Sequence, residues 1–211
     1  MQLQQISEFL QKGDANKVAE LTQQAIEQKM AAQDILDNGL IAWMNVIGEL
    51  FKTHKIFIPE VLLAAKAMNA GMDLLKPLLI LQNVRALGKI VLGTIEGDLH
   101  DIGKNLVGIM LKGAGFGVVD LGRDVSAEQF VETAIAEKAD IIGMSALLTT
   151  TMFNMKKVTS LLKEKNIDGS IKTIVGGAPL SEQIAQEFGA DAYAYDAANA
   201  VERVKMLVGA G

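Results

Sequence analysis

The sequence predicts an α/β fold in which a four-helix bundle precedes a five-stranded parallel sheet. Two patterns support this class. Residues 1–85 carry apolar side chains at helical spacing and show no strand pattern, whereas short apolar runs alternate with amphipathic segments from residue 89 onward. Five such β/α units require a parallel sheet with helices on both faces. We therefore expect a helical domain at 1–85 and an α/β domain at 89–211, joined by the polar residues 82–88.

Four helices are expected in the first domain. Gly13 and Asp14 supply a break and an N-cap between the first two helices. Pro59 suits the first turn of the fourth helix, and Pro77 is expected to end or kink it. Short connections between amphipathic helices indicate a small antiparallel bundle. The expected helices cover residues 2–11, 15–29, 32–53 and a last segment from about 58 towards Pro77.

Strands and helices alternate in the second domain. The strand predictions rest on apolar runs rich in β-branched residues, and the helix predictions rest on apolar residues at helical spacing. The expected strands cover residues 89–92, 117–121, 140–144, 172–175 and 192–194. The expected helices cover residues 105–112, 127–138, 152–164, 181–188 and 197–208.

Composition excludes several classes of function. Of the 211 residues, 50% are hydrophobic, which is enough for a sizeable core. The net charge of -5 argues against nucleic acid as a partner, since nucleic-acid binders usually display a basic face. The absence of cysteine excludes disulfides and thiolate zinc sites. We see no signal-peptide pattern and no segment near about 20 uninterrupted apolar residues, so we expect a cytoplasmic protein that does not bind membranes.

Three unusual segments follow strands of the predicted sheet. In a doubly wound sheet, ligands bind beyond the carboxyl ends of the strands, where the strand order reverses. The first segment, residues 97–103, contains His100 two positions after Asp98, so the carboxylate can reach one imidazole nitrogen while the other points outward as a base or metal ligand. A hydroxyl-rich segment at 145–151 and a bare Gly176-Gly177 pair follow the third and fourth strands.

Other interpretations of these segments fit less well. Residues 97–105 depart from a phosphate-binding loop, because Asn105 stands where Ser or Thr would hold magnesium. Ser145 lies on no nucleophile elbow, which weakens a hydrolase built on His100 and Asp98. Taken singly, Asp98 could be a helix cap and the glycines a plain turn. One histidine with a carboxylate partner suits a metal that arrives with its equatorial ligands attached, that is, a macrocycle.

The three segments together resemble the signature of cobalamin-binding domains that replace the cofactor's own base with a protein histidine on cobalt. The first segment is similar to the version in methionine synthase and in stand-alone corrinoid methyl carriers. The resemblance extends to the helical domain, where residues 48–51 and 57–60 are similar to the four-helix cap of methyl-transferring members. It implies a helical cap followed by a Rossmann-like (flavodoxin-like) sheet. The matching residues are Asp98-x-His100-x-x-Gly103, Ser145-x-Leu147 and Gly176-Gly177.

The resemblance also implies roles for individual residues. His100 would be the lower axial ligand of cobalt, Asp98 would hydrogen-bond its other ring nitrogen, and Thr151 would extend this relay where methionine synthase has serine. Phe51 and Ile58 of the cap would shield a bound methyl group. The remaining implied cofactor-binding residues are Asp101 and Ile102 in the first motif, Ser145, Leu147 and Thr149 along the slot for the nucleotide tail, and Gly103, Gly176 and Gly177 where that tail passes close to the backbone.

The implied function is methyl transport on the cobalt of cobalamin, cycling between Co(I) and methyl-Co(III). A substrate-specific methyltransferase for methylamine, methanol, betaine or a methoxyaromatic compound would load the methyl group. A second corrinoid-dependent methyltransferase would pass it to tetrahydrofolate or coenzyme M, and a reductive activase would restore Co(I). The chain would then be a carrier without catalytic residues of its own, with a cap that swings on the join at 82–88. A cobalamin-dependent sensor and the small subunit of an adenosylcobalamin mutase remain alternatives.

Overall fold

The computed structural model describes residues 2–82, 84 and 86–209. The chain forms two compact units, one comprising residues 1–85 with Gly113–Gly115 and the other the rest of the chain. The join expected at residues 82–88 includes positions 83 and 85, which lie outside the described residues. None of the described helices is long and apolar enough to cross a membrane.

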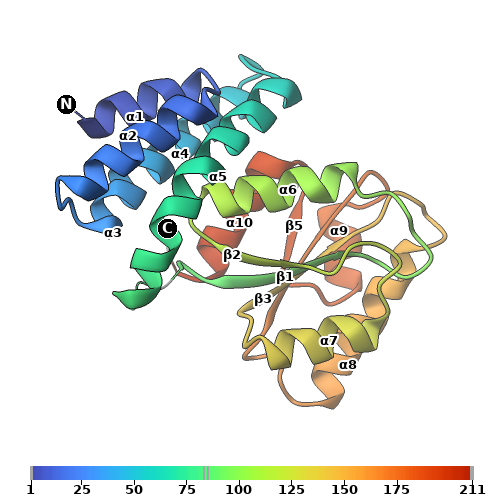
Figure 1. Ribbon diagram of the computed structural model, residues 1–211. Helices are drawn as coiled ribbons and strands as arrows, with labels where there is room; N and C mark the ends of the chain where they lie inside the picture. The colour runs from blue at the N-terminus through green and yellow to red at the C-terminus, as the bar shows by residue number, and fades with distance from the viewer. Residues whose placement is uncertain (1, 83, 85, 210–211) are drawn as a thin grey trace. The chain divides into compact units, whose positions relative to one another are not determined.

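Helices alone build the first unit (Figure 1). As predicted, Asp14 caps the second helix, since its carboxylate accepts a hydrogen bond from the Lys17 amide at 3.0 Å. Fully buried side chains such as Ile6, Leu10 and Val18 form the core of this unit. The helical segments are α1 (Gln2–Gln11), α2 (Ala15–Glu27), α3 (Ala32–Asp34), the π-helix η1 (Ile35–Ile41), α4 (Ala42–Lys52) and α5 (Ile58–Leu81).

The helix predicted at 32–53 is present as the contiguous segments α3, η1 and α4, but its residues Ile35–Ile41 are π-helical instead of α-helical. This segment carries Gly39, where an added Cβ would lie 3.5 and 3.6 Å from Leu3 and Ile6 of α1, at ordinary contact distance. The buried Ser7 hydroxyl lies 3.2 Å from the Gly39 carbonyl oxygen and can donate a hydrogen bond to it. Tertiary packing against α1 therefore accompanies the change in helical register, which hydrophobic spacing could not reveal.

Pro77 does not end the fourth predicted helix, because α5 continues through it to Leu81. A proline removes one backbone hydrogen bond and crowds the preceding turn. Leu75 and Leu79, on either side of it, are both buried in the core. Their burial offsets the lost hydrogen bond, so the helix does not end at Pro77, and a kink there stays a prediction.

A five-stranded parallel sheet organises the second unit, with the strand order β2-β1-β3-β4-β5. This is the flavodoxin-like order, and its switch point lies between β1 and β3. The strands are β1 (Lys89–Thr94), β2 (Gly117–Asp120), β3 (Ile141–Ser145), β4 (Lys172–Gly176) and β5 (Ala192–Ala194). The helical segments are α6 (Ile102–Gly113), α7 (Ala127–Ala136), the 3-10 turn η2 (Met152–Asn154), α8 (Met155–Glu164), α9 (Glu182–Glu187) and α10 (Ala197–Leu207).

Helices cover both faces of the sheet. In Figure 1, α6 and α10 lie on one face, and α7 and α8 lie on the other. One buried cluster joins Val91, Ile142 and Val175 of the sheet to Phe130 of α7 and Val158 of α8. Four of the strands, β1, β3, β4 and β5, end in one register row, so the segments that follow them leave from a common edge; the row is Thr94, Ser145, Gly176 and Ala194.

The helix α6 begins at Ile102, three residues before its predicted start. The Asp101 carbonyl already accepts a hydrogen bond from the Asn105 amide at 2.8 Å. The start of α6 was predicted from its buried apolar face. Ile102 lies outside that face, because it is 80% exposed. The first turn of α6 therefore lies within the motif that contains His100, at the carboxyl edge of β1.

Candidate functional site

The loop after β1 presents His100 at the switch point of the sheet. The His100 Nδ1 lies 2.7 Å from Asp98 Oδ1, and the His100 amide donates to the same oxygen at 3.0 Å. The Asp98 side chain is completely buried, whereas that of His100 is 51% exposed. The predicted pairing of these two side chains is therefore present. With Nδ1 facing the carboxylate, Nε2 is the ring nitrogen that is free to bind a ligand.

Asp98 also ties this loop to the segment after β3. Its second oxygen, Oδ2, accepts hydrogen bonds from the Leu147 amide at 2.8 Å, the Leu148 amide at 3.2 Å and the Thr151 hydroxyl at 2.9 Å. The hydrogen bond from Thr151 that the resemblance implied is thus formed. One buried carboxylate joins two of the three predicted segments and orients the imidazole.

These contacts keep Asp98 ionised. Burial alone would raise the pKa of Asp98, but the hydrogen bonds from the His100 and Leu147 amides, the His100 ring and the Thr151 hydroxyl outweigh it. They hold the pKa of this carboxyl well below its usual range. A permanent negative charge behind Nδ1 fixes the ring orientation and makes Nε2 a better electron donor.

Exposed apolar side chains occur in both segments that meet at Asp98. Leu99 and Ile102 on the histidine loop, and Leu147 and Leu148 on the facing segment, are each more than 40% exposed. A cluster of exposed apolar groups at a ligand edge suits a broad, partly apolar molecule better than a hydrated ion. Among residues 2–82, 84 and 86–209, no group of three or more histidine or acidic side chains could hold a metal. The site fits a metal that brings its own macrocycle.

The three predicted glycines differ in what they contact. A side chain at Gly103 would meet no atom within 4 Å, so open space adjoins the start of α6. A Cβ at Gly176 would lie 3.0 Å from the Ala194 carbonyl oxygen. Gly177 has a φ of +135°, and a Cβ there would overlap the Ala146 carbonyl. Gly177 is therefore required by the fold itself, whatever passes over it.

The other predicted site residues are placed as follows. Ser145 pairs with Gly176 in the last register row of the sheet, and Thr149 is exposed in the turn after β3. Asp101 is half-buried just before α6. Phe51, half-buried in α4, and Ile58, exposed at the start of α5, lie in the first unit.

A buried lysine near the site was not singled out from the sequence. Lys104, in the first turn of α6, has a side chain only 1% exposed, and its Nζ lies 2.6 and 2.7 Å from the two carboxylate oxygens of Asp120. It also donates to the Asn105 side chain at 2.7 Å. The ion pair links the start of α6 to the end of β2. Only the sheet order, which places β2 beside β1, could have revealed it.

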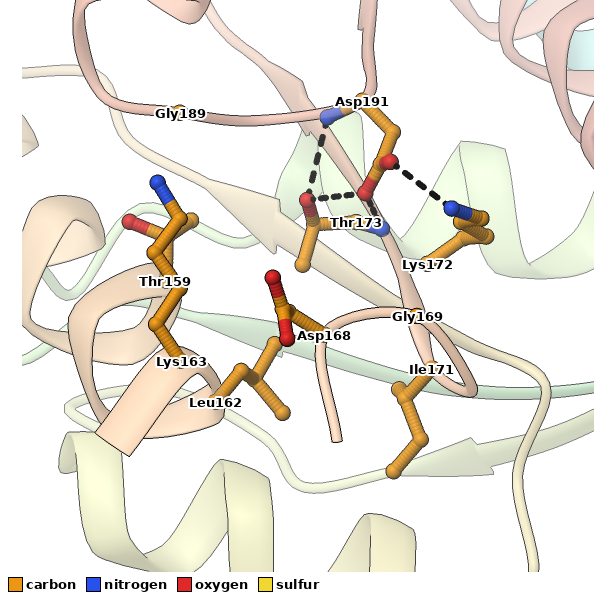
Figure 2. Close-up of a pocket in the computed structure, with 10 residues that line it drawn as sticks. All are labelled: Thr159, Leu162, Lys163, Asp168, Gly169, Ile171, Lys172, Thr173, Gly189 and Asp191. Atoms are coloured by element: carbon orange, nitrogen blue, oxygen red, sulfur yellow. Dashed lines mark hydrogen bonds and ion pairs between the residues drawn. The ribbon is translucent and has the colours of Figure 1, made fainter. Parts of the chain in front are cut away.

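A separate hollow of about 260 Å³ lies at the opposite edge of the sheet (Figure 2). Lys172, Thr173 and Asp191, at the amino ends of β4 and β5, line it. Asp191 accepts hydrogen bonds from the Thr173 amide and hydroxyl at 2.8 and 2.9 Å and pairs with Lys172 at 3.3 Å. These polar groups satisfy one another, and the hollow forms no part of the histidine site.

Fold and site together define a doubly wound α/β domain that presents a carboxylate-anchored histidine at its switch point, preceded by a helical unit. The comparisons with known proteins give this class a family. Residues 88–205 match the family model of a B12 binding domain, and residues 2–76 match a second B12 binding domain model.

Curated relatives agree with these matches over nearly the whole chain. A corrinoid protein of Desulfitobacterium hafniense is 43% identical over 210 residues, which cover 98% of this chain and 97% of that protein. Trimethylamine corrinoid protein 1 of Methanosarcina mazei is 45% identical over 194 residues, covering 91% of this chain and 90% of that protein. The chain therefore belongs to the family of cobalamin-binding corrinoid proteins, and its cofactor is cobalamin.

Solved structures support the same assignment. The methanol:cobalamin methyltransferase complex of Methanosarcina barkeri contains a chain with a TM-score of 0.88 and 32% identity, over 100% of this chain and 80% of that one. A cobalamin-binding protein of Desulfitobacterium hafniense has a TM-score of 0.79 and 33% identity, over 97% of this chain and 98% of that one.

Proposed function

We propose that this protein is a methyl carrier of a methyltransferase system and holds cobalamin through His100. The observation that carries the proposal is the imidazole of His100, fixed by the buried Asp98 at 2.7 Å and exposed on its other side. Bound cobalamin supplies a cobalt centre that can accept a methyl group and pass it on.

The residues of this chain hold and orient the cofactor. Nε2 of His100 would hold the cobalt, in place of the cofactor's own base. Asp98 keeps the proton on Nδ1 and aims the ring, and Thr151 stabilises the ionised form of Asp98. Leu99 and Ile102 would exclude water around this contact.

The nucleotide tail of the cofactor would pass the carboxyl ends of β3 and β4. Ser145 and Gly176 end these strands side by side. Gly103, in the first turn of α6, adjoins open space. Leu147, Thr149 and Gly177 extend the same edge. We propose that the helical unit acts as a cap. Its residues Phe51 and Ile58 would shield the methyl group.

The proposed partners follow from the named relatives. Corrinoid proteins for trimethylamine and for dimethylamine are among them, and a solved relative is part of a methanol:cobalamin methyltransferase complex. We propose that a substrate-specific methyltransferase loads this chain, that a second methyltransferase unloads it to tetrahydrofolate or coenzyme M, and that a reductive activase maintains the cofactor. None of the residues assigned above would perform the chemistry of either transfer.

The test is substitution of the histidine ligand in holoprotein. We expect His100→Ala to keep the circular dichroism spectrum of wild type, because the side chain is half exposed, and to lose the absorption spectrum of histidine-ligated cobalamin. His54→Asn is the matched control, since His54 is the other histidine and asparagine tolerates its φ of +56°. An unchanged cofactor spectrum in His100→Ala would disprove the ligand assignment. Failure of reduced wild-type holoprotein to take up a methyl group from any loading methyltransferase would disprove the carrier role.

A further inference from the structure

Asp124 adopts an uncommon backbone conformation beside the histidine loop. It lies between β2 and α7 with a φ of +57°, in the left-handed region that few residues other than glycine occupy. Aspartate enters this region more readily than most residues, at some cost in free energy.

Two hydrogen bonds explain the conformation. The carboxylate of Asp124 accepts from the Gly97 amide at 2.7 Å, and its own amide donates to the Asp98 carbonyl at 3.1 Å. The left-handed turn therefore lets one residue contact backbone groups of two consecutive residues of the histidine loop, the amide of Gly97 and the carbonyl of Asp98. Both bonds act on the main chain just before His100.

The surrounding backbone fixes the position of Asp124. The Thr94 amide at the end of β1 donates to the Gly122 carbonyl at 2.9 Å, and the Val125 amide donates to the Thr94 carbonyl at 3.0 Å. Val125 also forms an isolated parallel bridge with Ile95. The loop after β2 is thus bonded to the end of β1 on both sides of Asp124. This holds the Asp124 carboxylate within hydrogen-bond distance of the Gly97 amide.

We propose that Asp124 is a positioning residue for the axial histidine. The inference rests on the proposed function, because it concerns the ligand role of His100. Asp98 orients the imidazole ring and ties the loop to the segment after β3, whereas Asp124 holds the loop from the side of β2. Gly97, with a φ of +82°, is a flexible position one residue earlier. The Asp124 carboxylate restrains the Gly97 amide and so helps to set where His100 would hold the cofactor.

A second contact limits the expected effect. On the other side of the loop, the Asn154 side chain donates to the Glu96 carbonyl at 2.9 Å. Asp124 itself is exposed, so water can partly replace its carboxylate. Loss of the Gly97 bond should therefore loosen the loop without unfolding it. We expect changes of about fivefold in the ratio of histidine-ligated to histidine-free cofactor and in the exchange rate of the Gly97 amide.

The test compares three variants of the full chain. Asp124→Gly keeps the positive φ and the amide donor but removes the carboxylate, whereas Asp124→Asn retains an acceptor oxygen. Lys138→Gly is the matched control, because Lys138 also has a positive φ, of +53°, and is exposed in the turn after α7. In holoprotein at one fixed pH, the ratio of histidine-ligated to histidine-free cofactor is measured by absorption spectroscopy. We expect Asp124→Gly to lower it about fivefold, and Asp124→Asn and Lys138→Gly to stay within about twofold of wild type.

Amide hydrogen exchange in apoprotein supplies a readout without cofactor. We expect the Gly97 amide to exchange about fivefold faster in Asp124→Gly than in wild type or Lys138→Gly. Wild-type values of both the ligation ratio and the Gly97 exchange rate in Asp124→Gly would overturn this inference alone. Faster exchange with an unchanged ligation ratio would also overturn it, since the contact would then be only structural. A wild-type holoprotein without a histidine-ligated spectrum would instead overturn the proposed function, and this inference with it.

Discussion

Replacing Thr151 with valine tests how much the hydroxyl contributes to holding Asp98. The substitution keeps the branched shape and removes only the oxygen that lies 2.9 Å from Asp98 Oδ2. The same hydroxyl lies 3.1 Å from the Leu148 carbonyl, but its single proton favours the closer, charged acceptor. Asp98 is fully buried and Thr151 only 8% exposed, so water cannot replace the lost donor.

The magnitude follows from the environment of the carboxylate. A hydrogen bond to a charged group contributes about 1.5–3 kcal/mol to stability. The Leu147 and Leu148 amides still donate to Oδ2 in the variant, so the lower half of this range applies. We therefore expect Thr151→Val to reduce the free energy of unfolding of apoprotein by about 2 kcal/mol. For a chain of this length, that corresponds to a fall in Tm of about 4–8 °C.

The assay is urea denaturation of apoprotein at neutral pH, followed by circular dichroism. Thr151→Ser is the control, since it keeps the hydroxyl and loses only a methyl group, and it should cost less than about 1 kcal/mol. Equal denaturation midpoints for Thr151→Val and wild type would refute the reasoning. Equal losses in Thr151→Val and Thr151→Ser would refute it as well, because the methyl group would then account for the effect.

Three further predictions concern stability. Thr22 is fully buried and its hydroxyl has no hydrogen-bond partner among the described residues. Thr22→Val should therefore raise the free energy of unfolding by about 1 kcal/mol, which thermal denaturation would show as a higher midpoint. Gly177→Ala should lower the yield of folded apoprotein or cost at least about 2 kcal/mol in denaturation, because the added methyl group would overlap the Ala146 carbonyl; wild-type stability would contradict this. The pKa of Asp98 is lower in the folded state than its unfolded value of about 3.9, so its ionisation stabilises the protein above that pH and this contribution is lost as the pH falls. Acid titration should therefore reduce the stability of wild type more than that of Asp98→Asn between about pH 5 and pH 2, and parallel curves would contradict the shift.

Much of the fold followed from periodicity. The first predicted helix coincides with α1, and all five predicted strands exist, because buried parallel strands have a strong apolar signal. The errors lie where tertiary contacts override local preference. The π-helical turn at η1 packs on α1 through Gly39, and α5 continues past Pro77 because buried leucines on both sides hold it.

The sequence by itself determined the class of protein, the position of the candidate histidine and its pairing with Asp98, because these depend on residue types at short, fixed spacing. Tertiary structure alone decided what surrounds that pair. The hydrogen bonds from the Leu147 and Leu148 amides to Asp98, the Lys104 ion pair with Asp120 and the Asp124 contact with Gly97 all join segments that lie far apart in the chain or on different loops. Such contacts depend on strand order and register, because these bring the ends of separate strands to one edge of the sheet. Local sequence patterns therefore do not predict them.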